Sequence, residues 1–235
     1  MSTPGLGRAL LAESLGSAAL LAGVVGSGIM AAQLSGGNDG VALLANAIAT
    51  GALLVVLITL LGPISGAHFN PAVSLAMALR DELPWPRFAA YLPAQLLGGV
   101  AGVLLAHAMF DLDLWQPGTR SRTGGGQWLS EGVATFGLLL TILLAQRYRP
   151  AAIPALVATY IVAAYWFTAS TSFANPAVTA ARSLTQTFAG IAPQDVGAFM
   201  AAQLTGALLA VPVAAMLLGR DQSEGRPGMP QQSAR

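Results

Sequence analysis

The sequence predicts an all-α membrane protein with six transmembrane helices and two re-entrant half-helices arranged as an inverted repeat. Of the 235 residues, 54% are hydrophobic and only 9% are charged, which is too little polar surface to cover a soluble globule. Six apolar runs each approach the ~20 residues that a helix needs to cross a bilayer. The tripeptide Asn-Pro-Ala occurs twice, at Asn70–Ala72 and Asn175–Ala177. A duplicated motif in a membrane chain indicates an internal repeat.

The predicted spans follow one another along the chain with short polar connections. They cover residues 9–32, 41–61, 87–109, 129–147, 151–168 and 195–218. The first run has no cleavage pattern of a signal peptide, so we expect a retained helix. Cysteine is absent, which excludes disulfides and thiolate ligands. The net charge of +1 gives no indication of a nucleic-acid partner.

Other elements recur with the tripeptide. Glu13 opens the first span and Glu131 opens the fourth, while Gln95-Leu in the third span matches Gln203-Leu in the sixth. Each half has three spans, an odd number, so the halves must be inverted relative to each other. The expected organisation is a first repeat over 1–110 with a half-helix at 70–79, a connecting loop over 111–128, a second repeat over 129–218 with a half-helix at 175–184, and a disordered cytoplasmic tail over 219–235.

Each Asn-Pro-Ala is a helix start, with Asn as the cap and Pro at the first helical position. Taken alone, one copy is an ordinary helix cap. Two copies between the spans of an inverted repeat predict two half-helices inside the membrane. Helices of about nine residues are roughly 14 Å long, which is half a bilayer. Entering from opposite sides, they meet with their positive dipole ends facing. That point repels cations and protons, while Asn70 and Asn175 offer N–H donors to a neutral solute.

Three further polar residues lie near these motifs. Glu13 and Glu131 are ionisable groups at or within spans, where such groups are costly. We expect them either at the membrane edge or as scaffold, accepting hydrogen bonds from the N–H groups of the re-entrant loops, rather than in a proton relay. His68, two residues before Asn70, either lines the pore approach or fixes the loop. His107, alone in the third span, is interpreted as structural.

The arginines orient the chain, because positively charged loops stay in the cytoplasm. Three arginines, Arg120, Arg122 and Arg182, fall on one side of the six-span arrangement. The remaining eight fall on the other side, namely Arg8, Arg80, Arg87, Arg147, Arg149, Arg220, Arg226 and Arg235. Both termini are therefore expected to be cytoplasmic.

The segment Ser65–Val73, together with the paired Glu and Gln-Leu elements, resembles the signature of the aquaporin, or major intrinsic protein, family over residues 8–218. The resemblance implies the aquaporin fold and passive permeation, with no catalytic residues, no metal and no cofactor. It also implies a homotetramer with one pore in each monomer. The spacing of Gly98 and Gly102 permits close helix contacts of the kind that such an assembly uses.

In most members of that family an Arg directly follows the second Asn-Pro-Ala and belongs to a four-residue selectivity filter. Here that position is Val178. Counting from the two Asn residues, the other filter positions fall on Thr50, Ala163 and Ser172. All four residues are small and none is charged or aromatic, so the filter is expected to be wide.

Arg182 lies four residues after Val178, hence about one helical turn nearer the outer mouth. We expect its guanidinium either at the outer approach to the pore, where it favours polar solutes, or at the membrane interface as a loop cap. The segment 175–191, with Val178 and the Thr187–Ile191 run, resembles bacterial aquaglyceroporins encoded in arsenic-resistance operons. This resemblance implies a multi-pass protein of the bacterial inner membrane that conducts arsenite and methylated arsenicals.

The predicted partners are the lipid bilayer and small neutral solutes, namely metalloid hydroxides, polyols and water. Two alternatives remain open. One is a glycerol, urea or water channel without a role in arsenic transport. The other is a secondary transporter, which also uses inverted repeats but is expected to place an acidic or basic side chain in mid-span. An enzyme is not expected, since two distant His residues supply no credible pair of nucleophile and base.

Overall fold

The computed structural model describes residues 5–219, and all regular secondary structure in that range is helical. Six helical segments are long and apolar enough to cross a membrane, as predicted. They are α1 (Leu6–Leu34), α2 (Asp39–Ser65), α4 (Trp85–Met109), α5 (Gly125–Tyr148), α6 (Ile153–Phe167) with its leading 3₁₀ turn Pro150–Ala152, and α8 (Pro193–Leu218). Two short helices complete the set, α3 (Pro71–Leu79) and α7 (Pro176–Arg182).

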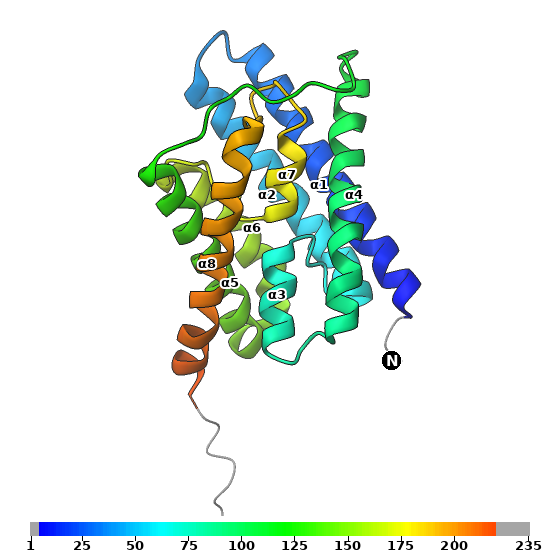
Figure 1. The fold of residues 1–235 in the computed structure, drawn as a ribbon, viewed down its shortest axis with the longest axis vertical. Helices are drawn as coiled ribbons and strands as arrows, with labels where there is room; N and C mark the ends of the chain where they lie inside the picture. Colours follow the sequence, from blue (N-terminus) through cyan, green and yellow to red (C-terminus); the bar gives the residue numbers. More distant parts are fainter. Residues whose placement is uncertain (1–4, 220–235) are drawn as a thin grey trace, which may run out of the picture.

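The long helices surround the two short ones. In Figure 1, α3 occupies the lower half of the molecule and α7 the upper half, each beside long helices. The first residues of α1 and the last residues of α8 lie toward the same end of the molecule (Figure 1). This arrangement agrees with an even number of crossings and with half-helices that enter from opposite sides.

Glycines permit the closest helix contacts. A Cβ atom at Gly98 or Gly102 of α4 would collide with the backbone carbonyl groups of Ser14 or Ala18 in α1. Gly206 of α8 approaches α5 in the same way, at the carbonyl of Gly132. The close helix contacts that the spacing of Gly98 and Gly102 permits are therefore made within one chain, between α4 and α1.

The observed helices end up to four residues from the predicted limits, and two of these differences have a clear physical cause. Helix α5 begins at Gly125, inside the loop expected over 111–128. Of the three glycines at 124–126, only Gly124 has a positive φ, of 111°, and its carbonyl accepts from the N–H of Gln127 and of Trp128 at 3.0 and 3.1 Å. The glycine run thus starts a helix instead of interrupting one.

Helix α7 ends at Arg182, two residues before the predicted limit at 184. The Ser183 hydroxyl bonds the carbonyl oxygen of Ala180 at 2.7 Å. The N–H of Ile191 donates to the carbonyl oxygen of Arg182 at 3.3 Å, so the chain folds back across the helix end. Of the tail expected over 219–235, residues 220–235 lie outside the described part of the chain.

Candidate functional site

The two Asn residues cap the half-helices, as their position before Pro dictates. Asn70 Oδ1 accepts from the N–H of Ala72 at 2.9 Å. Asn175 Oδ1 accepts from the N–H of Ala177 at 2.9 Å and of Val178 at 3.2 Å. Because the oxygen of each amide is held by its own helix, the NH₂ group of each is directed away from that helix.

Both Asn residues also join the two halves of the molecule. Asn70 Nδ2 donates to the carbonyl oxygen of Ala174 at 2.8 Å, and Asn175 Nδ2 donates to that of Phe69 at 2.7 Å. An amide nitrogen carries two hydrogens, so each Asn keeps one donor after this exchange. Both residues line a central cavity of about 180 Å³. The N-termini of α3 and α7 therefore meet at this cavity with two N–H donors available to a solute.

Glu13 of α1 is fully buried and holds the loop before α3. Its carboxylate accepts from the N–H of His68 at 2.9 Å and of Phe69 at 2.7 Å. The Ser65 hydroxyl and the Gln95 amide also donate to it, at 2.6 and 2.8 Å. Four donors satisfy a buried carboxylate that would otherwise be costly.

Glu131 of α5, also fully buried, does the same in the second half. It accepts from the N–H of Phe173 and of Ala174, both at 2.8 Å. Gln203 Nε2 donates to it at 2.6 Å and bonds Thr179 Oγ1 of α7 at 2.7 Å. The Gln of each repeat thus ties a carboxylate to a half-helix, a role that the sequence pattern did not reveal.

The loops held in this way contain strained backbone. Ala67 and Phe69 have φ of 50° and 47°, and Ser172 and Ala174 have φ of 50° and 49°. The left-handed region costs a non-glycine residue roughly 1–2 kcal/mol. The hydrogen bonds to Glu13 and Glu131 offset that cost and hold in place the loop residues that line the cavity.

The structure brings three of the four predicted filter residues to the cavity wall, namely Thr50, Ser172 and Val178. Ser172 Oγ is buried and has no partner among the described residues, so its hydroxyl is available to a solute. Val178 presents an aliphatic side chain in the first turn of α7.

Ala163 is not at the cavity, and its assignment to the filter is wrong. On α6 the cavity is lined by residues spaced by four, namely Ile153, Val157, Ile161 and Tyr165. A residue two positions from Ile161 or Tyr165 is rotated by about 200°, and Ala163 is accordingly exposed on the outer face. Counting twelve residues back from Asn175 misplaced the filter position by half a turn of helix.

Tyr165 is the α6 residue at the cavity beside Thr50. Its hydroxyl and that of Thr50 are 3.3 Å apart, at hydrogen-bond distance. The expectation of a ring without an aromatic residue is therefore also wrong. The periodicity of α6, with apolar residues every fourth position up to Tyr165, was the signal that identified this face.

Most of the remaining wall is aliphatic. The described residues of this kind include Leu20, Val24, Leu54, Ile58, Leu138 and Ile142. An apolar wall interrupted by a few hydrogen-bonding groups suits solutes that carry both apolar and hydroxyl surface.

Arg182 lines the central cavity, at the end that the predicted orientation places outside, and is 2% exposed. Its Nε donates to the carbonyl oxygen of Ala189, and its guanidinium carbon is 3.4 Å from the centre of the Phe173 ring. Arg182 lines both the central cavity and a second, outer cavity. The charge is thus held at the junction of the two and does not extend to the membrane interface.

Arg122 was not identified as a site residue from the sequence. It lies in the loop between α4 and α5 and is 7% exposed. Its guanidinium donates to the carbonyl oxygens of Gly190 and Ser170 at 2.9 and 3.0 Å and is 4.8 Å from the centre of the Phe173 ring. The only signal in the sequence was an arginine on the side of the membrane that is poor in positive charge.

His68 lines the central cavity and a third, inner cavity. Its Nδ1 is 3.0 Å from Ser74 Oγ, so it both faces the pore and anchors the loop to α3. His107, in contrast, bonds Thr185 Oγ1 and the Leu114 carbonyl, both at 2.8 Å, which joins α4 to two loops.

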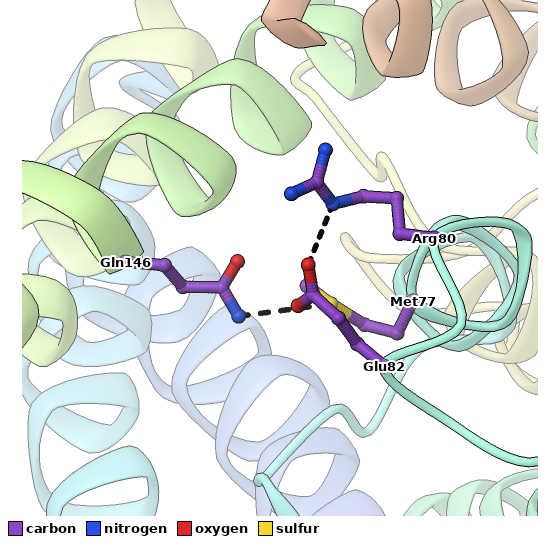
Figure 2. A network of polar contacts seen from close by, with 4 residues as sticks. All are labelled: Met77, Arg80, Glu82 and Gln146. Atoms are coloured by element: carbon purple, nitrogen blue, oxygen red, sulfur yellow. Dashed lines mark hydrogen bonds and ion pairs between the residues drawn. The ribbon is translucent and has the colours of Figure 1, made fainter. Parts of the chain in front are cut away.

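The inner mouth lies where α3 ends beside α5. Figure 2 shows Gln146 of α5 reaching toward Met77 of α3 and toward Glu82 in the turn that follows. Gln146 Nε2 is 3.7 Å from Met77 Sδ, and Arg80 Nε is 2.7 Å from Glu82 Oε1. Met77, Gln146 and His68 line both the central and the inner cavities. The central cavity thus shares wall residues with the inner cavity at one end and shares Arg182 with the outer cavity at the other.

Six membrane-spanning helices, two facing half-helices and a cavity lined by both capping Asn residues are the features of a membrane channel. The family model described as Major intrinsic protein matches residues 1–165. The chain belongs to the major intrinsic protein family.

Individual relatives agree with this assignment. The chain is 57% identical over 213 residues, 91% of both chains, to "Aquaglyceroporin AqpS" of Rhizobium meliloti (strain 1021). It is 37% identical over 106 residues, 45% of this chain and 38% of the relative, to "Probable aquaporin NIP7-1" of Arabidopsis thaliana. Among solved structures, the aquaglyceroporin from Plasmodium falciparum has the same fold. The TM-score is 0.67, with 18% identity over 88% of this chain and 95% of the other.

Proposed function

We propose that the protein is a passive channel for small uncharged solutes of the aquaglyceroporin type. The observation that carries this proposal is the cavity lined by Asn70 and Asn175, where two half-helix N-termini meet. Positive dipole ends oppose cations there, while two amide donors and the Ser172 hydroxyl receive a neutral solute. Among the described residues that line this cavity there is no Asp, Glu or Lys, which favours a channel over an ion-coupled transporter.

The solutes we assign are arsenite in its neutral form, As(OH)₃, methylated arsenicals, glycerol and water. The mixed aliphatic and hydroxyl wall, and Val178 in place of the usual Arg, support solutes larger than water. The similarity over 91% of both chains to a protein named an aquaglyceroporin supports glycerol and water. The filter we propose consists of Thr50, Tyr165, Ser172 and Val178.

Stopped-flow measurements on proteoliposomes test this function. We expect flux of arsenite and glycerol with a low activation energy and no dependence on a gradient of H⁺ or Na⁺. Water and methylarsenate in the same assay define the solute range. Flux that required an ion gradient would identify a transporter and contradict the proposal.

Arg182 sets the charge at the outer approach in this proposal. An Arg182→Ala channel should admit small cations more readily and conduct partly anionic solutes more slowly, because the positive potential at the junction is lost. An unchanged solute range and rate would overturn this role.

For the assembly we propose a homotetramer in the bacterial inner membrane, each monomer with its own pore. Large apolar side chains are exposed on the outer faces of the helices, such as Leu97, Leu129 and Met216, and lipid or neighbouring copies would cover them. Chemical cross-linking in native membranes should give four-chain species. Monomers alone, at the same cross-linker concentration, would contradict the tetramer.

A further inference from the structure

We propose that the outer cavity is a binding site for a small oxyanion, held by the guanidinium groups of Arg122 and Arg182. This inference goes beyond the conduction of neutral solutes. It concerns what the outer mouth binds, and its test measures binding without flux, so that it can fail while the channel function holds.

The cavity has room for such a ligand. Its volume is about 270 Å³, several times the ~30 Å³ share of a water molecule in the liquid. Arg120, Arg122 and Arg182 all contribute to its wall, beside the polar side chains of Asn46, Ser121 and Thr171. Three cations around one cavity of this size favour an anionic occupant.

Arg122 and Arg182 are buried without an ion pair. Their guanidinium groups donate to carbonyl oxygens, and within residues 5–219 the structure records no ion pair for either of them. The carbonyl oxygens carry only partial negative charges. They therefore do not neutralise the two full positive charges of Arg122 and Arg182, which are buried. Buried charges are normally paired or bound to a ligand, because an unpaired one is costly.

The two charges are also close to each other. Both guanidinium groups contact the Phe173 ring. Burial, followed by the like charges of Arg182 and Arg120, lowers the pKa of Arg122 to about 9. The side chain still carries its charge at pH 7, so the repulsion persists at neutral pH. An anion between the two groups would remove that repulsion.

The nearby carboxylates form no recorded ion pair with the two arginines in the described part of the chain, although the charge of Glu131 favours the charged form of Arg122. Asp195 Oδ2 accepts from the backbone N–H of Arg122 at 2.6 Å, and Glu131 is occupied by the N–H groups of Phe173 and Ala174. Asp39 is exposed and lies on the cavity wall, where its charge opposes an anion.

Arg182 has hydrogen-bond donors available for the ligand. Among described residues, only its Nε has a hydrogen-bond acceptor, which leaves the two terminal nitrogens for the cavity that it lines. A guanidinium fork matches two oxygens of a carboxylate or of a tetrahedral oxyanion. The shared chemistry is therefore a compact anion with at least two exposed oxygens.

The test uses the full-length protein purified in detergent, with inorganic phosphate, acetate and ammonium as probes. Calorimetric titration at pH 7 and constant ionic strength should show saturable binding of phosphate or acetate and none of ammonium. A ligand that binds the folded state also raises the unfolding midpoint. We expect Arg182→Gln to weaken binding at least tenfold, while Arg182→Lys retains part of it. Arg8→Gln, a change at an exposed arginine of α1, is the control.

A second variant separates binding from folding defects. Asp39→Asn removes the one negative side chain on the cavity wall and should tighten phosphate binding several-fold, a gain that misfolding cannot imitate. The inference is overturned if the unmodified protein shows no saturable oxyanion binding. It is also overturned if Arg182→Gln and Arg8→Gln bind phosphate equally well, or if Asp39→Asn leaves the affinity unchanged.

Discussion

At the scale of single residues, Val178 is the position where an exchange should change the solute range most. Its aliphatic side chain lies on the cavity wall, in the helix that carries Arg182 one turn further along. In Val178→Arg a long cationic side chain would occupy the space beside Thr50. We expect glycerol and methylarsenate flux to fall at least tenfold, equivalent to roughly 1.4 kcal/mol in the barrier, with a smaller effect on water. Stopped-flow light scattering measures both.

Val178→Leu is the matched control for that exchange, because it adds volume without charge. A similar loss in both variants would show that width alone controls the filter. If bulky-solute flux through Val178→Arg stayed at its original level, the filter would not lie at this residue.

Tyr165 and Thr50 form the only recorded side-chain hydrogen bond across the proposed filter, within the described part of the chain. Tyr165→Phe removes that bond but keeps the ring, so the free energy of unfolding should fall by about 1 kcal/mol. The freed Thr50 hydroxyl should raise the ratio of glycerol to water permeability. Tyr165→Ala would widen the ring as well. Equal permeability ratios in all three proteins would remove Tyr165 from the filter.

Residues at the filter were only partly predictable from the sequence. Thr50, Ser172 and Val178 follow from fixed distances to the Asn-Pro-Ala motifs, because the backbone around those motifs is tightly held. Ala163 failed, since its distance from Asn175 depends on where α6 ends and on the path of the following loop. Arg122 carries no motif and approaches Phe173 only through tertiary folding.

At the scale of elements, the re-entrant loops depend on the two buried glutamates. Glu131→Ala leaves the N–H groups of Phe173 and Ala174 and the Gln203 amide without their acceptor, in a loop that contains residues of positive φ. We expect a loss of about 3 kcal/mol in stability, seen as a lower unfolding midpoint in detergent, together with loss of flux. Glu82→Ala is the control, because Glu82 is about one-third exposed and its ion pair with Arg80 lies outside the re-entrant loops. Equal midpoints in the two variants would contradict the scaffold role.

Most of the helices could be predicted from the sequence. Span length and the start signals Asn-Pro depend on local chemistry, so all six spans and the first residue of each half-helix agree with the structure. The end of α7 could not be predicted from the sequence. The helix stops where the N–H of Ile191 bonds the carbonyl oxygen of Arg182, and this contact depends on the fold of the following loop. The glycine run before α5 was misread for a related reason: Gly124 takes the unusual conformation and the next glycines can be helical.

At the scale of the whole molecule, the two inverted halves bring their capping Asn residues together at the central cavity. Asn70 and Asn175 bond each other's loops, so neither half can complete the constriction alone. The outer faces of the helices carry exposed apolar side chains. These side chains do not distinguish the two sides of the bilayer, so the orientation must come from the charged loops at the two ends of the molecule. The first residues of α1 and the last of α8 lie toward the same end (Figure 1), the end to which the arginine-rich loops belong.

The positive-inside rule therefore predicts that both termini face the cytoplasm. A fluorescent protein fused after Gly219 should fluoresce, and alkaline phosphatase at the same point should be inactive. Phosphatase inserted at Asp113, in the exposed loop between α4 and α5, should be active because that loop is expected outside. The reverse pattern at both points would place the cavity lined by Arg122 and Arg182 on the cytoplasmic side. The proposed oxyanion would then reach it from within the cell, so this experiment decides which compartment the site samples.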